Sequence, residues 1–347
     1  MSSISHDVIR ECSNCNSALP LGAVACPDCH TLVYAAELDK LSREARALEA
    51  KGDLAQAREV WNRTLALLPP DSKQTVWVND KLRALGTRIN TAPDPQAKPD
   101  HAWAKKLGPL GPIAIVLAKS KGLLLAVFKL KFLFSFFAYL ALYVAMFGWR
   151  FGVGFAVSIL IHELGHFVDI KRRGLPAEMP VFLPGLGAYV KWNALGVTRR
   201  QVAQISLAGP LAGWLAAAAC YVIYTYTHDP LWASLARTGA VINVLNLIPI
   251  WILDGGKAAN PLGSVGRAAL LAVALGCWLY FGENIFALVA AGIVWRLFTK
   301  DKPAQDDWSV WLYYAAVLIA LGVVLHAVPA ELVQPPSANP TTRNFFQ

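Results

Sequence analysis

The distribution of apolar residues divides the chain into a polar first third and an apolar remainder. Residues 1–104 are polar, whereas Leu, Ala, Val, Ile, Phe and Trp dominate residues 107–328. Apolar runs that approach the length needed to cross about 30 Å of hydrocarbon recur in this second part. The pattern predicts a mostly α-helical, polytopic membrane protein with about six to seven spans, at 132–149, 151–170, 202–226, 232–253, 267–281, 284–298 and 308–328. Residues 107–128 are a candidate for a further interfacial or partly inserted helix.

Residues 176–198 interrupt this series of spans. They mix Pro and Gly with a β-prone run and cannot form a continuous helix. Non-helical backbone at membrane depth is tolerated only where protein or a water-filled cavity covers it. We expect a re-entrant β-hairpin that offers a strand edge to an extended peptide. A plain cytosolic loop is the alternative interpretation.

Charge is placed at the ends of the apolar runs. The 347-residue chain is 55% hydrophobic and only 16% charged, with a net charge of +9. The basic residues do not form one block but recur beside spans, as at Lys171–Arg173 and at Arg199 and Arg200. This distribution is typical of the positive-inside rule, so no nucleic-acid partner is expected. Residues 1–30 lack the apolar core of a signal peptide, which predicts a cytosolic head on a multi-pass protein of the cell membrane.

Four cysteines near the N-terminus form two CxxC pairs, Cys12 with Cys15 and Cys26 with Cys29. Four thiolates in this arrangement can close a tetrahedral structural zinc site, which a short chain needs in order to fold. The spacing predicts a zinc ribbon over residues 1–33. Two disulfides are the alternative, which a cytosolic location disfavours.

The segment that follows the cysteines has a helical pattern over residues 36–86. It resembles a tetratricopeptide repeat at Ala45, Leu48, Gly52, Leu54, Ala57, Trp61 and Pro69. We expect an antiparallel helix pair that turns at residues 51–53, with a third helix at 72–86 to cover it, because a single repeat cannot bury its own face. The segment is either a docking surface for a protein partner or a short helical spacer.

These patterns predict five regions along the chain. They are a soluble zinc ribbon (1–33), a tetratricopeptide-like helical hairpin segment (34–89), a proline-containing linker (90–106), the membrane domain (107–330) and a C-terminal tail (331–347).

One predicted span carries three ionisable residues within five positions. His162-Glu163-Leu164-Gly165-His166 is an HExxH motif. Positions i and i+4 lie on one face of a helix, so both imidazoles can reach one zinc ion, and the glutamate can take a proton from a water at that ion. Ionisable groups in a membrane span are costly and usually functional. A structural polar network between helices is the alternative.

A catalytic zinc ion needs a third protein ligand and one open position. The best candidate is Asp254, which follows the apolar run NVLNLIPIWIL and precedes Gly255 and Gly256. In the predicted topology it lies near the same side of the membrane as the end of the HExxH span. A helix-end residue at the membrane boundary is the alternative interpretation of Asp254.

The HELGH motif within a span, together with Asn246-x2-Pro249-x4-Asp254-Gly255, resembles the site-2 protease family of intramembrane metalloproteases over residues 120–300. The resemblance implies that His162, His166 and Asp254 bind a catalytic zinc ion and that Glu163 is the general base. It also implies a transmembrane helix of another protein as substrate, unwound to a strand at the element in residues 176–198. The two Zn²⁺ ions expected per chain are then one catalytic and one structural.

The chain departs from the family pattern at one position. Many members carry an asparagine three residues after the Gly-Pro of the third span, whereas this chain has Gly213 after Gly209-Pro210. Asn243 and Asn246 are the candidates for its role toward the substrate carbonyl.

The sequence therefore predicts an intramembrane zinc endopeptidase whose head regulates or recruits. A non-proteolytic membrane scaffold or receptor with a structural metal site is the alternative. The intact glutamate argues against it. A zinc transporter would need histidine- or acid-rich loops, which this chain lacks.

Overall fold

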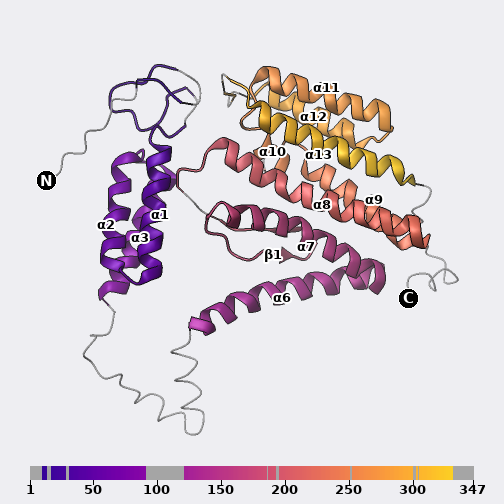
Figure 1. Ribbon diagram of the computed structural model, residues 1–347, viewed down its shortest axis with the longest axis horizontal. Helices are drawn as coiled ribbons and strands as arrows, with labels where there is room; N and C mark the ends of the chain where they lie inside the picture. The colour runs from indigo at the N-terminus through magenta and orange to yellow at the C-terminus, as the bar shows by residue number, and fades with distance from the viewer. Residues whose placement is uncertain are drawn as a thin grey trace, which may run out of the picture. The chain divides into compact units, whose positions relative to one another are not determined.

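The computed structural model of the protein describes residues 10–13, 17–28, 31–90, 121–185, 187–192, 195–250, 252–299, 302–303 and 305–330. The chain forms two compact units, one of residues Ala36–Phe137 and one of Met1–Ala35 with Ala138–Gln347. Figure 1 shows the elements along the chain.

The head contains the helices that the sequence predicts. They are α1 (Ala35–Lys51), α2 (Leu54–Thr64), the short 3₁₀ helix η1 (Leu65–Leu67) and α3 (Lys73–Asn90). Gly52 makes the turn between α1 and α2 with a φ of 93°, a conformation that glycine adopts without strain. Trp61 of α2 is fully buried, and its ring lies 5.3 Å from that of Trp77, so α3 covers the helix pair. The assignment to the tetratricopeptide family stays a prediction.

The first cysteine of each CxxC pair makes the same kind of backbone contact. The amide of Cys12 donates to the carbonyl of Ser17, and the amide of Cys26 donates to that of Thr31, both at 2.9 Å. Cys12 and Cys26 are buried together against Leu19. Cys15 and Cys29 lie outside the described residues, so the structural zinc site stays a prediction.

The described part of the chain contains five helices that are long and apolar enough to cross a membrane. They are α6 (Lys121–Phe147), α7 (Trp149–Arg172), α8 (Arg199–Thr227), α11 (Ser264–Phe281) and α13 (Trp308–Ala327). Two shorter helices, α9 (Pro230–Asn246) and α12 (Ile285–Leu297), account for the other predicted spans. Large apolar side chains are exposed on the helices of this apolar part, such as Leu279 of α11 at 81%, which suits contact with lipid rather than water. The prediction of a polytopic helical membrane protein is confirmed.

The chain between the fourth span and Asp254 differs from the expected continuous run of 232–253. Helix α9 ends at Asn246, and a separate five-residue helix, α10 (Asp254–Ala258), begins at the aspartate. Pro249 lies between them, and proline can neither donate a helix hydrogen bond nor fit against the preceding turn. Asp254 therefore begins a helix of its own instead of ending the span.

The hairpin predicted in residues 176–198 is present. Strands β1 (Val181–Leu183) and β2 (Gly187–Tyr189) pair in antiparallel register, with Phe182 opposite Ala188. Phe182 is 1% exposed, and its ring lies 5.3 Å from that of Tyr139 on α6. This contact anchors one strand, while β2 packs against α7.

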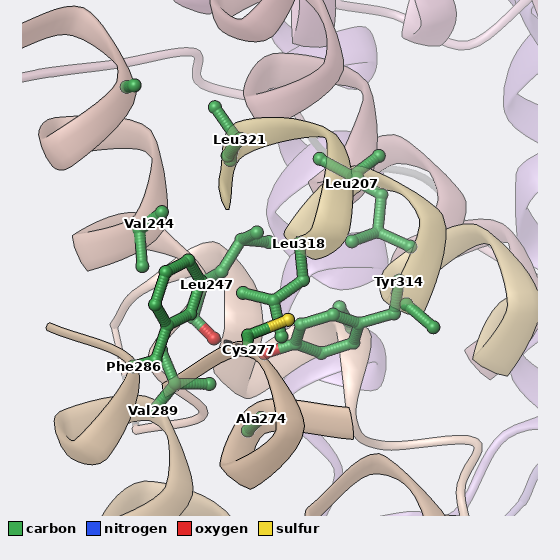
Figure 2. Packing of buried hydrophobic residues seen from close by; sticks show 14 of the residues in the cluster. Leu207, Val244, Leu247, Ala274, Cys277, Phe286, Val289, Tyr314, Leu318 and Leu321 are labelled. Atoms are coloured by element: carbon green, nitrogen blue, oxygen red, sulfur yellow. Dashed lines mark hydrogen bonds between the residues drawn. The ribbon is translucent and has the colours of Figure 1, made fainter. Parts of the chain in front are cut away.

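One apolar core joins α8, α9, α11, α12 and α13. Figure 2 shows part of it, with Leu247, Phe286, Tyr314 and Leu318 in close contact. The Tyr314 hydroxyl donates to the backbone carbonyl of Leu247, which fixes the chain where α9 ends and turns toward Asp254.

An ion pair joins the first turn of α8 to the start of α13. The Arg200 guanidinium donates to both carboxylate oxygens of Asp307, and the Ser309 hydroxyl and Val310 amide donate to the same group. Burial of the carboxyl opposes its ionisation, but these donors outweigh that effect and lower the pKa of Asp307 to about 2.

The low pKa of Asp307 predicts an acid sensitivity. An unfolded aspartate has a pKa of about 3.9, so the folded state binds fewer protons between that value and about 2. The stabilisation is complete above about pH 4 and is lost as the pH falls toward 2. We expect Asp307→Asn to lower the thermal-unfolding midpoint at pH 6 and to flatten its fall between pH 4 and 2. An identical fall in both proteins would contradict this role.

Candidate metal centre

Helix α7 carries the HExxH motif on its buried face. His162, Glu163 and His166 are 4%, 6% and 8% exposed, within a helix that is otherwise apolar in this stretch. The ring centroids of the two histidines lie 4.9 Å apart, as expected for i and i+4 positions on one helix face. Figure 1 shows α7 beside α8, and α7 also packs against α9.

Each histidine is held through its Nδ1 atom. His166 Nδ1 lies 2.8 Å from the backbone carbonyl oxygen of Ile205, which can only accept, so the imidazole donates. His162 Nδ1 lies 2.7 Å from Oδ1 of Asn243. Both rings therefore carry their proton on Nδ1 and present the unprotonated Nε2 to the site, which is the tautomer that binds a metal ion.

Asp254 reaches the same point from α10. The helix begins at this residue, and Gly255 and Gly256 follow it. A Cβ atom at Gly255 would overlap with the backbone of Leu247, and one at Gly256 would overlap with that of Ile250. The two glycines therefore allow α10 to pack tightly against the turn after α9, which brings the aspartate to the histidines.

The three side chains converge on one small space. The two Nε2 atoms lie 3.2 Å apart, and Oδ2 of Asp254 lies 3.2 Å from each of them. All three atoms are acceptors, so they repel one another unless a cation lies between them. Protons on both Nε2 atoms would let Asp254 accept from each imidazole but would set two N–H groups against each other at 3.2 Å, whereas a divalent ion satisfies all three atoms.

The spacing suits zinc. Ligand atoms at about 2.0–2.2 Å from a tetrahedral zinc ion lie about 3.3–3.6 Å from one another, slightly more than the observed 3.2 Å. Two imidazoles and a carboxylate are also a donor set of catalytic zinc sites, in which the fourth position stays open. The residues present therefore fit the ion that the sequence predicts.

A cavity of about 440 Å³ lies beside the three ligands. Glu163 lines it together with Lys257 and Asn246. Other walls come from α6, through Tyr139 and Tyr143, and from the hairpin, through residues 187–190. The volume admits several water molecules or a short length of peptide next to the glutamate.

Comparison with known proteins points to one family. Residues 150–229, which include HExxH, match the model of Peptidase family M50. The predicted resemblance to the site-2 protease type of zinc metalloprotease is thereby confirmed for the part of the chain that carries the motif.

Three curated relatives extend the similarity. The probable zinc metalloprotease EGY1, described as chloroplastic, is 22% identical over 225 residues in Arabidopsis thaliana, covering 48% of this chain and 40% of the relative. Its namesake in Oryza sativa is 23% identical, with 49% and 38% covered. A zinc metalloprotease of Methanocaldococcus jannaschii is 24% identical over 147 residues, with 40% and 42% covered. The chain thus spans about two fifths of the length of these relatives, and no solved structure matches it.

The structure brings together all four residues predicted for the catalytic centre. Asn246, one of the two candidates for the missing asparagine, lines the cavity, whereas Asn243 contacts His162 instead. The sequence reasoning missed Tyr139 and Tyr143, although polar-tipped residues four apart in an apolar span are a usable signal. It could not have found the carbonyl of Ile205, because no side chain marks a backbone acceptor.

Removal of one proposed ligand should prevent zinc from binding at the site of His162, His166 and Asp254. Asp254→Ala leaves two imidazoles, too few for a stable site, so we expect bound zinc to fall from about two ions per chain to about one. Elemental analysis of purified protein measures this.

Glu163→Gln is the matched control, because it alters the same cavity without removing a ligand, and it should keep the zinc content of the parent chain. Retention of both ions by Asp254→Ala would show that this aspartate is not a ligand.

Proposed function

We propose that the protein is an intramembrane zinc endopeptidase, which hydrolyses a peptide bond in or near a transmembrane helix of a membrane-anchored protein. One observation carries the proposal. Three acceptor atoms meet at 3.2 Å inside an apolar helical unit, beside the buried Glu163. Two of them belong to His162 and His166, which lie with Glu163 in the segment 150–229 that matches Peptidase family M50.

The residues at the site have distinct roles in this proposal. His162, His166 and Asp254 hold the zinc ion, which when bound acts as a Lewis acid toward the scissile carbonyl and toward water. Glu163 accepts the proton of the attacking water and later returns it to the leaving amine. The side-chain amide of Asn246, at the cavity wall, is the candidate donor to the substrate carbonyl.

Substrate access follows from the hairpin. A helix must unwind before hydrolysis, because its carbonyls are hydrogen-bonded and screened by side chains. Strand β2 lines the cavity and forms its ladder with β1 on one side, which supports binding of the unwound segment as an added strand along the other. The catalytic residues would then face the backbone of the bound strand.

The general base provides the sharpest test of the activity. Glu163→Gln keeps the size of the side chain but removes its basicity, so we expect cleavage to fall by at least 100-fold. The assay uses full-length protein in liposomes with a single-span reporter whose apolar helix contains a Gly-Pro pair. Products are identified by mass spectrometry.

Glu178→Gln is the matched control, since Glu178 is an exposed carboxylate before β1, away from the cavity lining. A zinc chelator should stop cleavage, and added Zn²⁺ should restore it. Cleavage by Glu163→Gln at the rate of the parent chain would refute the proposed base. Absence of cleavage by the parent chain across unfolded and membrane-spanning reporters would favour the non-proteolytic scaffold or receptor.

The head is proposed to regulate the protease or to recruit a protein partner, from the cytosolic side of the cell membrane. The helices α1 to α3 have exposed faces and pack on one another within the unit Ala36–Phe137, which supports this separation of roles for the helical part of the head. Deletion of residues 1–100 should change substrate choice while the zinc affinity of the His–His–Asp site stays the same. Loss of that affinity on deletion would contradict a purely regulatory head.

A further inference from the structure

Asn243 is a polar residue in the interior of α9, and it is 4% exposed. Its side-chain amide is engaged on both sides. Nδ2 donates to the carbonyl of Gly239 at 2.7 Å, and Oδ1 lies 2.7 Å from Nδ1 of His162. Because a carbonyl can only accept, Nδ2 must face Gly239. Oδ1 therefore faces the histidine and accepts its proton.

The space that holds this amide is open because α8 has no side chain there. A Cβ atom at Gly213 would overlap with Oδ1, Nδ2 and Cγ of Asn243. Even a methyl group at position 213 would displace the amide from His162, because the amide is confined by α8 on one side and by its own helix on the other. The Asn243 amide can therefore occupy its place beside His162 only because residue 213 has no side chain.

The position of the Asn243 amide gives a physical reason for the glycine at position 213, where many members of the family carry an asparagine. The amide that this chain lacks on α8 lies instead on α9, in the room that a side chain at 213 would need. It points to a zinc-binding histidine and not into the cavity that Asn246 lines.

We propose that Asn243 is a positioning residue for His162, and that Gly213 is required because it makes room for the Asn243 amide. By accepting the Nδ1 proton, Asn243 fixes the tautomer and the ring orientation that direct Nε2 toward the metal ion. The inference rests on the proposed function only in taking His162 as a zinc ligand.

The two positions make a double-mutant cycle whose readout is metal affinity. Loss of a partner that orients a metal-binding histidine typically weakens metal binding by about 10–100-fold. We expect Asn243→Ala to weaken binding at the His–His–Asp site within this range. Gly213→Ala should do the same, although residue 213 touches no ligand. The double variant should be no weaker than Asn243→Ala alone, because the added methyl then meets an empty space.

The cycle is measured by titrating the full chain in detergent with Co²⁺ in competition with a chelator. Cobalt bound to cysteine thiolates has a charge-transfer absorption that a His–His–Asp site lacks, so the two classes of site are separated. Ser234→Ala, a buried polar residue on the same helix, is the control for Asn243→Ala. Gly276→Ala, where a methyl group meets open space, is the control for Gly213→Ala.

Affinities equal to those of the controls, or losses that simply add in the double variant, would overturn the proposal. If Gly213→Ala alone does not fold, the Asn243→Ala background supplies the comparison, because it has room for the methyl group.

His162→Ala distinguishes a failure of the proposed metal centre from a failure of the proposed positioning role of Asn243. Cobalt that still binds the His–His–Asp site in this variant would refute the metal centre itself and with it the proposed function. Cobalt lost in His162→Ala but unchanged in Asn243→Ala and Gly213→Ala would refute only the positioning role.

Discussion

Two imidazole nitrogens and a carboxylate oxygen meet inside an apolar helical unit, each 3.2 Å from the other two. Hydrocarbon and packed side chains solvate such groups poorly, so an uncompensated cluster would destabilise the fold by several kcal/mol. A shared divalent ion converts this repulsion into ligand bonds. Much of the architecture serves that point, from the continuous α7 to the separate α10 that begins at Asp254.

Close approach of the helices makes the cluster achievable. A Cβ atom at Gly209 would overlap with the ring of His166, and one at Gly165 would overlap with the Ala208 carbonyl. Small residues of this kind let helix backbones pack closely where no hydrophobic force drives association between spans. Gly165 and Gly209, together with Gly213 and Gly255, are positions around the site where no side chain separates the packed segments. These glycines therefore affect the chemistry of the site, because they determine how closely its polar side chains can approach one another.

Much of this could be predicted from the sequence, for physical reasons. The apolar runs set the spans, and the spacing of His162 and His166 placed both rings on one helix face. The sequence indicates Asp254 because it follows an apolar run, precedes two glycines and lies near the same side of the membrane as the end of the HExxH span in the predicted topology. The apolar pattern predicts one continuous run up to residue 253, whereas α9 ends at Asn246, because Pro249 cannot continue the helix.

Other features depended on three-dimensional packing. The sequence leaves both a hairpin and a plain loop open for residues 176–198, because the ring contact between Phe182 and Tyr139 that anchors the hairpin joins residues 43 positions apart. The partners of the histidines also lie on other helices, at Ile205 and Asn243. Neither spacing nor composition indicates which backbone carbonyl or amide will meet an imidazole, because that depends on how α8 and α9 cross α7.

The most direct test of the account is the location of zinc by anomalous diffraction at the zinc absorption edge, on crystals of the full chain. We expect a peak at about 2.0–2.2 Å from Nε2 of His162, Nε2 of His166 and a carboxylate oxygen of Asp254. Glu163 should lie beside the peak without contacting it as a ligand. A zinc-loaded crystal with no peak among these three side chains, or with Glu163 in place of Asp254 as a ligand, would contradict the account.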